Sequence, residues 1–508
     1  MSREESDYVL VEPRAESLID SLRSVGYTTR AAVADLIDNS ITAGATTVWI
    51  TFWWSGADSY VTLKDDGAGM SAERLTEAMR AGSSSPLDVR EKVDLGRFGL
   101  GLKTASFSQC KSLTVASKPA GAEVSVRCWD LETVRRTRQW RLLKRGSASA
   151  AEHLSELDEM PHGTIVIWEQ LDRVVGDHPA TDAVARQHFQ GLIDEVREHL
   201  EMTFHRFLDG LRPALRIFVN GIDDAHALKA WDPYLASHSS TTMTPVEPLE
   251  IPGRGTFFVQ GFVLPHKDKL GDELHRQAAG PGGWNAQQGF YVYRSKRLVV
   301  AGSWLGLGAG KAWTKEEHYK LARIRLDLPN SIDAEWNLDV KKSTARPPAS
   351  VRPRLKTLAD QVRKTAREVF AHRGERPLVG PRKQGLSRIW YPKTLAGQQA
   401  YRLDRKHPLI KQLQVEHEDA AGDVEQLLRL IEETVPVQQI WLDSAEKPDL
   451  AAKPFGAATD GELDGLALTM LEATMASEGL SRAQALDRLK TSEPFAHYPD
   501  VLSRLETE

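Results

Sequence analysis

The chain has 508 residues, more than one hydrophobic core usually serves, so its length predicts three or four domains. Its composition, with 41% hydrophobic and 27% charged residues and a net charge of −5, is that of a soluble globular protein and excludes a wholly disordered chain. The two cysteines exclude a disulfide scaffold, no apolar run reaches the roughly 18 residues of a membrane span, and no signal peptide is recognisable, so we expect a cytoplasmic protein without a membrane partner.

The first predicted element with candidate functional side chains is a helix that carries Asp35 and Asn39. Ala31 to Ala34 and Leu36-Ile37 favour a helix with a buried apolar side. Because Asp35 and Asn39 are four residues apart, they project from the same face. A carboxylate above a carboxamide can position a water molecule and bind a hard cation through oxygen. The alternative is that Asp35 and Asp38 are simply solvated helix residues.

A strand at residues 60–64 leads directly into Asp65. Gly67 and Gly69 permit a tight turn after it and a close approach of a ligand to the backbone. A carboxylate acceptor at this place suits the exocyclic amine of adenine, and Met70 is an adaptable apolar contact that would pack on the ring. Taken alone, the same residues are more typical of a plain surface turn.

A glycine-rich segment follows, in which Gly96, Gly99 and Gly101 free backbone N–H groups to face anionic oxygens at the start of a helix over 102–110. Lys103, in the first turn of that helix, is poorly placed for the helix dipole but well placed for a phosphate. The preceding residues 81–94 are small, polar and charged, and we interpret them as a mobile lid.

The central part of the chain alternates helices and strands. A long helical stretch is predicted over 184–211, and we interpret the strand at 215–221 as the start of a second domain. Residues 256–264 form a clear strand, and the Gly/Gln-rich residues 278–288 suggest a flexible loop. Residues 289–299 predict a pair of strands joined by a basic turn.

The net charge conceals a strong asymmetry along the chain. Residues 341–411 hold 19 Lys and Arg against 4 Asp and Glu, a balance of +15, whereas residues 412–508 hold 7 against 20, a balance of −13. Six of the cations fall on one predicted helix: Arg352, Arg354, Lys356, Arg363, Lys364 and Arg367. They form either a solvated amphipathic face or a stripe that contacts the phosphates of nucleic acid.

The C-terminal part predicts helices from about Val424 onward, with a helix pair over 466–489 that turns at Gly479. Its acidic residues Asp460, Glu462 and Asp464 have no accompanying His or Cys ligands. We therefore interpret them as a solvated acidic loop rather than as the metal site of a nuclease.

Four motifs, ending with the Gly163-Thr164 strand, occur in an order that resembles the GHKL ATPases, the superfamily of gyrase B, heat-shock chaperones, MutL, MORC proteins and histidine kinases. The glycine motif at 96–103, in which a lysine follows the last glycine, is similar to the MORC branch. The resemblance implies an α+β fold: a Bergerat-type α/β sandwich ATPase at 1–175, a linker helix and S5-like transducer at 176–372, and a mainly helical region at 373–508.

The resemblance also implies roles for individual residues. Asp35 is the general base, at a position where Glu is commoner, so hydrolysis is expected to be slow. Asn39 holds Mg²⁺ against the triphosphate of ATP, and Asp65 reads adenine. A transducer lysine reaches the γ-phosphate, either Lys341 or Lys342, of which we favour Lys341. Further nucleotide contacts are expected from Gly67, Gly69, Met70, Gly96, Gly99, Leu100, Gly101, Leu102, Lys103, Thr104 and Thr164.

The function implied by the resemblance is an ATP-gated homodimeric clamp that acts on DNA through residues 341–411. Its setting would be bacterial DNA repair, restriction or phage defence, with a nuclease or helicase as a separate partner. The alternatives are a chaperone-like protein clamp and an ATP-sensing scaffold without DNA. A histidine kinase is disfavoured, because no phospho-acceptor helix pair precedes the ATP motifs.

Overall fold

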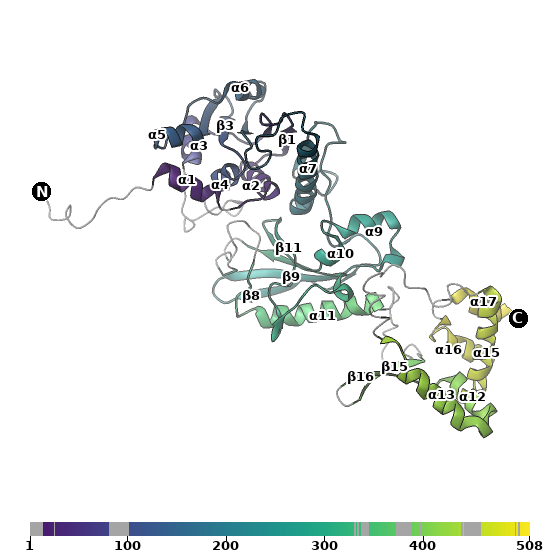
Figure 1. Cartoon of the computed structure of the whole chain (residues 1–508). Coiled ribbons are helices and arrows are strands. Elements are labelled where there is room, and N and C mark those ends of the chain that lie inside the picture. Colours follow the sequence, from purple (N-terminus) through teal and green to yellow (C-terminus); the bar gives the residue numbers. More distant parts are fainter. Residues whose placement is uncertain are drawn as a thin grey trace, which may run out of the picture. The chain divides into compact units, whose positions relative to one another are not determined.

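The computed structural model divides the chain into two compact units, residues 1–374 and 375–508 (Figure 1). It describes residues 14–24, 26–80, 101–329, 332, 335–336, 345–371, 389–395, 398–437, 440, 459–492, 494–495 and 498–507. Of the predicted site residues, Gly96, Gly99, Leu100, Lys341 and Lys342 lie outside the described residues.

The first unit begins with a six-stranded sheet in the order β4–β3–β5–β2–β1–β6. Its strands are β1 (Thr47–Trp53), β2 (Tyr60–Asp65), β3 (Ser112–Lys118), β4 (Ser125–Asp130), β5 (Gly163–Glu169) and β6 (Arg216–Val219). Neighbouring strands are antiparallel except β1 and β6, which are parallel. Side chains of β5 alternate between two cores, since Val166 and Trp168 join one and Ile165 and Ile167 the other. Both faces of the sheet are therefore covered.

The larger core lies between this sheet and a layer of helices (Figure 1). These helices are α1 (Ala15–Arg23), α2 (Thr29–Thr42), α4 (Gly101–Phe107) and α7 (Ala183–Thr203). Smaller helices complete the domain: α3 (Ala72–Met79), α5 (Leu131–Thr137), α6 (Ala148–Leu154) and α8 (His205–Leu208). Thr28 begins α2, because its side chain accepts a hydrogen bond from the backbone N–H of Ala31. Helix α2 packs against both α4 and α7, so most of its surface is buried.

The interpretation of residues 215–221 as the start of a second domain is wrong. Strand β6 pairs with β1 at the edge of the first sheet, and its Ile217 and Val219 are buried in the first core. The preceding helix α7 also belongs to this core, through Phe189, Ile193 and Val196. Parallel neighbours need a long crossover connection, and α7 lies within the one that leads to β6.

The second sheet of this unit has the order β11–β10–β14–β9–β7, with β8 also paired to β9. Its strands are β7 (Thr242–Met243), β8 (Glu247–Ile251), β9 (Gly255–Val263), β10 (Gly289–Arg294), β11 (Arg297–Ser303) and β14 (Ala322–Leu328). A small hairpin joins β12 (Gly308–Ala309) to β13 (Lys311–Ala312). The strand predicted over 256–264 and the strand pair predicted over 289–299 are confirmed. The fold is thus mixed α/β, as predicted.

The two faces of the second sheet differ in character. Phe290 and Val292 of β10 pack in a core with helix α11 (Arg352–Ala371). Tyr291 and Tyr293, which alternate with them, belong to an aromatic cluster that also receives Met202 from α7. The aromatic face of the second sheet therefore meets the end of α7, close to the first domain.

Residues 278–288 are not the flexible loop that their composition suggested. They include the end of α9 (Asp272–Ala279) and the short helix α10 (Gly283–Ala286). Gln288 is fully buried and exchanges hydrogen bonds with the backbone N–H and C=O of Glu316 at 3.1 Å each. Because the buried carboxamide of Gln288 has hydrogen-bond partners for both its donor and its acceptor, it helps to order a segment that composition alone suggested to be a loop.

Helix α11 confirms the predicted amphipathic helix but corrects its basic stripe. Arg363 is buried, and its guanidinium lies over the rings of Trp304, Trp313 and Tyr319 at 5.1, 4.1 and 3.9 Å. A cation enclosed by three aromatic rings is held by their electron-rich faces, so Arg363 is a packing residue of the second core. Four of the other cations are exposed: Arg352, Arg354, Lys364 and Arg367.

The second unit consists of a hairpin and helices. Its elements are β15 (Trp390–Leu395), β16 (Gln398–Leu403), α12 (Pro408–Glu416), α13 (Ala421–Glu433), α15 (Asp460–Glu478), α16 (Arg482–Leu489) and α17 (Pro499–Thr507). The predicted helix pair and its turn are confirmed, with Gly479 in the left-handed region at φ 64°.

The acidic residues interpreted as a solvated loop belong instead to helix α15, and two of them, Glu462 and Asp464, stabilise the structure. Glu462 caps the helix by accepting from the backbone N–H of Thr459, and Asp464 forms an ion pair with Arg504 at 2.6 Å. Among the described residues, no three His, Cys, Asp or Glu side chains are grouped to hold a metal ion. The described residues also contain no helix that is long and apolar enough to cross a membrane.

Candidate active site

Three polar side chains form a row across the first sheet, on the face that α2 covers. Asp65 of β2 lies opposite Thr164 of β5, and Thr164 lies opposite Ser117 of β3. The hydroxyl oxygens of Ser117 and Thr164 are 2.8 Å apart. All three side chains are buried. The sheet register thus brings together Asp65 and Thr164, which the sequence predicted as parts of one site.

The carboxylate of Asp65 is fixed by two donors. Ser40 Oγ donates to Oδ2 at 2.8 Å, and the backbone N–H of Gly67 donates to Oδ1 at 2.9 Å. Burial raises the pKa of Asp65, and these two hydrogen bonds only partly oppose it. The site therefore presents an oriented acceptor in a poorly hydrated place, which is what recognition of an amine on a flat ring requires.

Both predicted glycines of the turn after Asp65 are required by close packing. A Cβ atom on Gly67 would lie 2.9 Å from the Cβ of Ala43, at the end of α2. Gly69 has φ 69°, and a Cβ there would lie 2.1 Å from the carbonyl oxygen of Lys118. Met70 donates its backbone N–H to Ser117 Oγ at 2.8 Å. The turn is thereby held between the end of α2 and the end of β3.

Asp35 and Asn39 lie on α2, as predicted, but in different surroundings. Asp35 is buried, and its Oδ2 is 3.9 Å from the position that a Cβ on Gly101 would take, at the first residue of α4. Asn39 is exposed, one helical turn closer to Ser40 and Asp65. Its carboxamide oxygen is a hard donor open to solvent, so it fits a Mg²⁺ ion that takes its other ligands from water and phosphate.

The first turn of α4 is more enclosed than the sequence suggested. Lys103 is buried and donates from Nζ to the backbone carbonyl of Ala78 at 2.9 Å. Burial lowers the pKa of Lys103 to about 8, although Glu77 acts in the opposite direction. Thr104 is also buried, and among the described residues nothing forms a hydrogen bond with its hydroxyl. The contacts of Lys103 and Thr104 with a phosphate remain predictions, as does that of Leu102.

Sequence reasoning missed three residues at this site: Ser40, Ser117 and Arg297. Ser40 follows the Asp-Leu-Ile-Asp-Asn motif directly, so its proximity to the motif was a usable signal. No local pattern marks Ser117, because only the pairing of β3 with β5 places it beside Thr164. Arg297 was noted as part of a basic turn, but its partner, Asp38 of α2, could not be read from the sequence.

Comparison with known proteins agrees with this geometry. Residues 27–164 match the model of a family described as histidine kinase-, DNA gyrase B- and HSP90-like ATPases. The N-terminal region is a GHKL-type ATPase domain. The matched range contains the row on the first sheet and the predicted residues of α2.

Two relatives resemble shorter segments of the chain. The ATPase morc-1 of Caenorhabditis elegans is 32% identical over 91 residues, which are 18% of this chain and 10% of that protein. The DNA mismatch repair protein MutL of Azorhizobium caulinodans is 31% identical over 93 residues, which are 18% of this chain and 15% of that protein. The matched segments cover only 10% and 15% of the two relatives, so the likeness does not extend to their whole activities.

The first prediction concerns Asp65 and pH. Asp65→Asn should weaken ATP binding by roughly 10- to 100-fold, because it replaces a charged acceptor with an amide. In the unchanged protein, affinity should fall as pH is lowered through the raised pKa of Asp65, which lies above the ordinary 3.8. Protonation removes the charged acceptor, so binding is full above that pKa and lost below it. Isothermal titration calorimetry at several pH values measures both effects.

The phosphates of the nucleotide also titrate, so this contribution to the pH dependence of binding must be separated from that of Asp65. A pH dependence that persists unchanged in Asp65→Asn would belong to the nucleotide and would contradict the assignment. Asp66→Asn serves as a neighbouring variant, since Asp66 accepts hydrogen bonds only from Thr46 and Thr47 in the described contacts and holds the turn from outside the row.

Proposed function

We propose that the protein binds Mg²⁺–ATP at the row of Asp65, Thr164 and Ser117 and hydrolyses it with Asp35. The observation that carries this proposal is the placement of α2. Ser40, near the end of this helix, donates a hydrogen bond to the carboxylate of Asp65, and the same helix places Asp35 beside the start of α4 and leaves Asn39 exposed. One rigid helix thus links a site for the adenine ring to groups suited to the triphosphate.

The chemistry follows from the residue types. The carboxylate of Asp65 accepts a hydrogen bond from the adenine amine, while Asn39 would hold Mg²⁺, which neutralises phosphate charge when bound. Asp35 takes a proton from the water that attacks the γ-phosphorus, as the bond to the leaving ADP oxygen breaks. Aspartate reaches less far than glutamate, so we expect slow turnover. Lys341, or else Lys342, would contact the γ-phosphate.

The second prediction tests the base. Asp35→Ala should leave ATP affinity within about threefold of the original and lower the hydrolysis rate by roughly 10² to 10⁴, the usual contribution of a general base. A phosphate-release assay measures the rate, and calorimetry measures the affinity. Asp58→Ala, on the chain between β1 and β2, is the control for an aspartate outside the site. Hydrolysis by Asp35→Ala at the original rate would show that another group activates the water.

We further propose that ATP closes the protein into a homodimeric clamp. The support is the GHKL domain together with its resemblance to the MORC and MutL branch. A lid that orders around ATP can create a dimer surface that the nucleotide-free chain lacks. In that case ATP shifts the equilibrium from monomer to dimer without itself contacting the second copy.

The third prediction is therefore a change of mass. With a non-hydrolysable ATP analogue, size-exclusion chromatography with light scattering should give twice the monomer mass of 56.5 kDa, and without it the monomer mass. At an analogue concentration that saturates only the original protein, Asp65→Asn should stay monomeric, because its affinity is roughly 10- to 100-fold weaker, as expected above. A mass that does not respond to the analogue, in a protein shown to bind ATP, would contradict the clamp while leaving the ATPase proposal standing.

The proposed client is DNA, contacted through the basic region 341–411. Within it, α11 exposes Lys364 and Arg367, whereas the guanidinium of Arg354 is held by two hydrogen bonds of 2.7 Å to Glu247. A role beside a nuclease or helicase in repair, restriction or phage defence belongs to this proposal. The second candidate is a chaperone-like protein clamp, which the fold accommodates equally.

The fourth prediction separates these candidates. The double variant Lys364→Glu, Arg367→Glu should weaken DNA binding several-fold. It should also reduce the salt dependence of binding, because a protein that makes fewer phosphate contacts releases fewer counterions from the DNA. ATP hydrolysis should be unchanged. The matched control reverses two exposed cations outside the region, Arg212 and Lys229. Anisotropy titrations at two salt concentrations give the result, and absence of DNA binding at low salt would favour the protein clamp.

A further inference from the structure

Arg297 connects the second sheet to the helix of the ATPase site. It is the first residue of β11, directly after a two-residue turn in which Ser295 and Lys296 have φ of 47° and 71°. Such a turn makes a tight hairpin and fixes the direction of the residues that follow it. Arg297 is only 5% exposed, because its side chain reaches α2 instead of solvent.

The guanidinium of Arg297 meets two carboxylates that are one helical turn apart. Its Nε donates to both oxygens of Asp38, at 3.2 and 3.1 Å. Its Nη2 lies 3.8 Å from Oδ1 of Asp35, which is an ion-pair distance but too long for a hydrogen bond. Asp38 therefore anchors the arginine through its hydrogen bonds, and the guanidinium also forms an ion pair with Asp35.

The carboxylate of Asp35 thereby acquires two distinct sides. Oδ1 faces Arg297, while Oδ2 faces Gly101 at the start of α4. A side chain whose one oxygen is held by a cation has a defined rotamer, and its other oxygen then points in a defined direction. For a base that must accept a proton from a positioned water, this direction decides the reaction rate.

Arg297 is itself held firmly from the side of the second sheet. Its Nη1 donates to the backbone carbonyl of Leu298 at 2.8 Å. The second sheet is docked on the first domain by a hydrogen bond of 2.7 Å between His205 and Tyr293 of β10, and by an ion pair between Arg206 and Asp327 of β14. The position of Arg297 at α2 thus depends on the docking of the whole second sheet.

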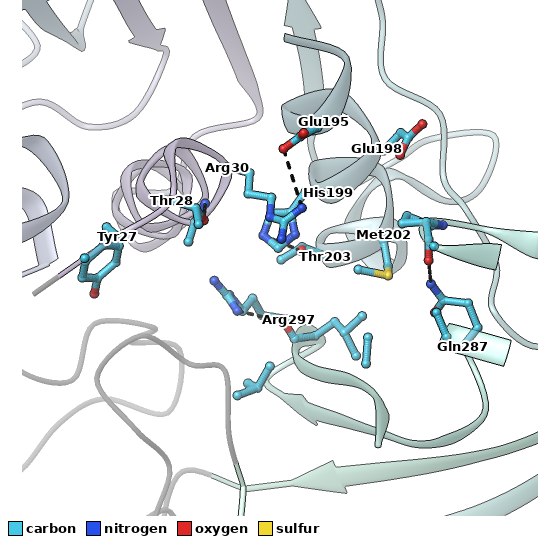
Figure 2. A pocket seen from close by; sticks show the side chains of 18 residues that line it. Tyr27, Thr28, Arg30, Glu195, Glu198, His199, Met202, Thr203, Gln287 and Arg297 are labelled. Atoms are coloured by element: carbon cyan, nitrogen blue, oxygen red, sulfur yellow. Dashed lines mark hydrogen bonds and ion pairs between the residues drawn. The ribbon is translucent and has the colours of Figure 1, made fainter. Parts of the chain in front are cut away.

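A cavity of about 560 Å³ lies beside this contact, between the start of α2, α7 and β11 (Figure 2). Figure 2 shows Arg297 and His199 directed into the same space, with Arg30 and Glu195 paired at 3.8 Å on one side. Burial lowers the pKa of His199 to about 3, so this histidine is neutral and does not compete with Arg297 for the carboxylates. Glu195, four residues before His199 on α7, is turned to Arg30.

We propose that Arg297 is a positioning residue for ATP hydrolysis: anchored by Asp38, it orients Asp35, so that hydrolysis requires the second sheet to be docked on α2. This inference rests on the proposed role of Asp35 as the base. It assigns no contact with the nucleotide to Arg297. The arginine acts through Asp35, and ATP binding at Asp65 is independent of it.

The test uses the full chain and compares Arg297→Met, Arg297→Lys and Lys296→Ala. Arg297→Met keeps length and loses charge, so kcat should fall by roughly 10- to 100-fold, the usual cost of a misplaced catalytic group. KM and the affinity for a non-hydrolysable ATP analogue should stay within about threefold. Arg297→Lys should recover part of kcat, because it restores charge without the forked geometry. Lys296→Ala removes an exposed cation from the same turn and should match the original protein.

A double-mutant cycle distinguishes positioning from a general loss of structure. If Arg297 acts through its anchor, Asp38→Asn should lower kcat in the original protein and have much less effect when combined with Arg297→Met. Thermal melting reports the folded fraction, to which each kcat is normalised. If Arg297→Met does not fold, the comparison of Arg297→Lys with Asp38→Asn carries the test.

The outcomes separate the two proposals. An original protein that hydrolyses ATP while the normalised kcat of the Arg297 variants is unchanged overturns this inference alone. Equal losses in kcat and in analogue affinity also overturn it, since they place Arg297 in binding. An original protein that neither binds nor hydrolyses ATP overturns the proposed function, and this inference with it.

Discussion

Helix α2 is a buried helix that carries polar side chains, and the rest of the first unit is arranged to satisfy them. Asp35, Asp38 and Ser40 are each nearly inaccessible to water. Burying such groups without partners would cost several kcal/mol, and an unpaired charge far more. The partners come from opposite directions, because Ser40 bonds to Asp65 on the first sheet and Asp38 to Arg297 on the second. The helix of the candidate site is thus also the structural link between the two sheets.

Small residues make this arrangement possible. Ala32 and Ala34 are fully buried, which lets α2 pack closely against its neighbouring helices. At its end, Ala43 leaves just enough space for Gly67, and a methyl group at Gly67 would press on both Ala43 and the carboxylate of Asp65. The position of the Asp65 carboxylate, the proposed acceptor for adenine, is therefore set by packing around α2 as much as by its own hydrogen bonds.

Local sequence located the helix and the turn that carry the candidate residues, but not the partners that those residues meet in the fold. Asp65 followed from a strand that runs into a glycine turn, and both features are encoded within a few residues. Ser117 could not be found in this way, because its place beside Thr164 depends on which strands pair and in which register. Arg297 and Asp38 are 259 residues apart, and only the docking of the second sheet brings them together.

The errors have equally physical causes. The six cations were correctly predicted to lie on one helix, as a solvated face or a phosphate-binding stripe, but neither alternative could show that three aromatic rings enclose Arg363. Strand β6 was interpreted as the start of a second domain because it follows a long helix. That helix lies in a crossover, which returns the chain to the first sheet.

The junction between the first domain and the second sheet is built differently from either core. Besides the aromatic cluster, it includes directional pairs such as Arg297 with Asp38, Arg206 with Asp327 and His205 with Tyr293, next to a cavity. A slight shift would leave a buried charge without its partner, which is costly, whereas full separation would return both partners to water. With such a junction, the first domain and the second sheet are more stable either docked or fully separated than in intermediate positions. This two-state behaviour is what a second domain needs if it is to control a base on α2.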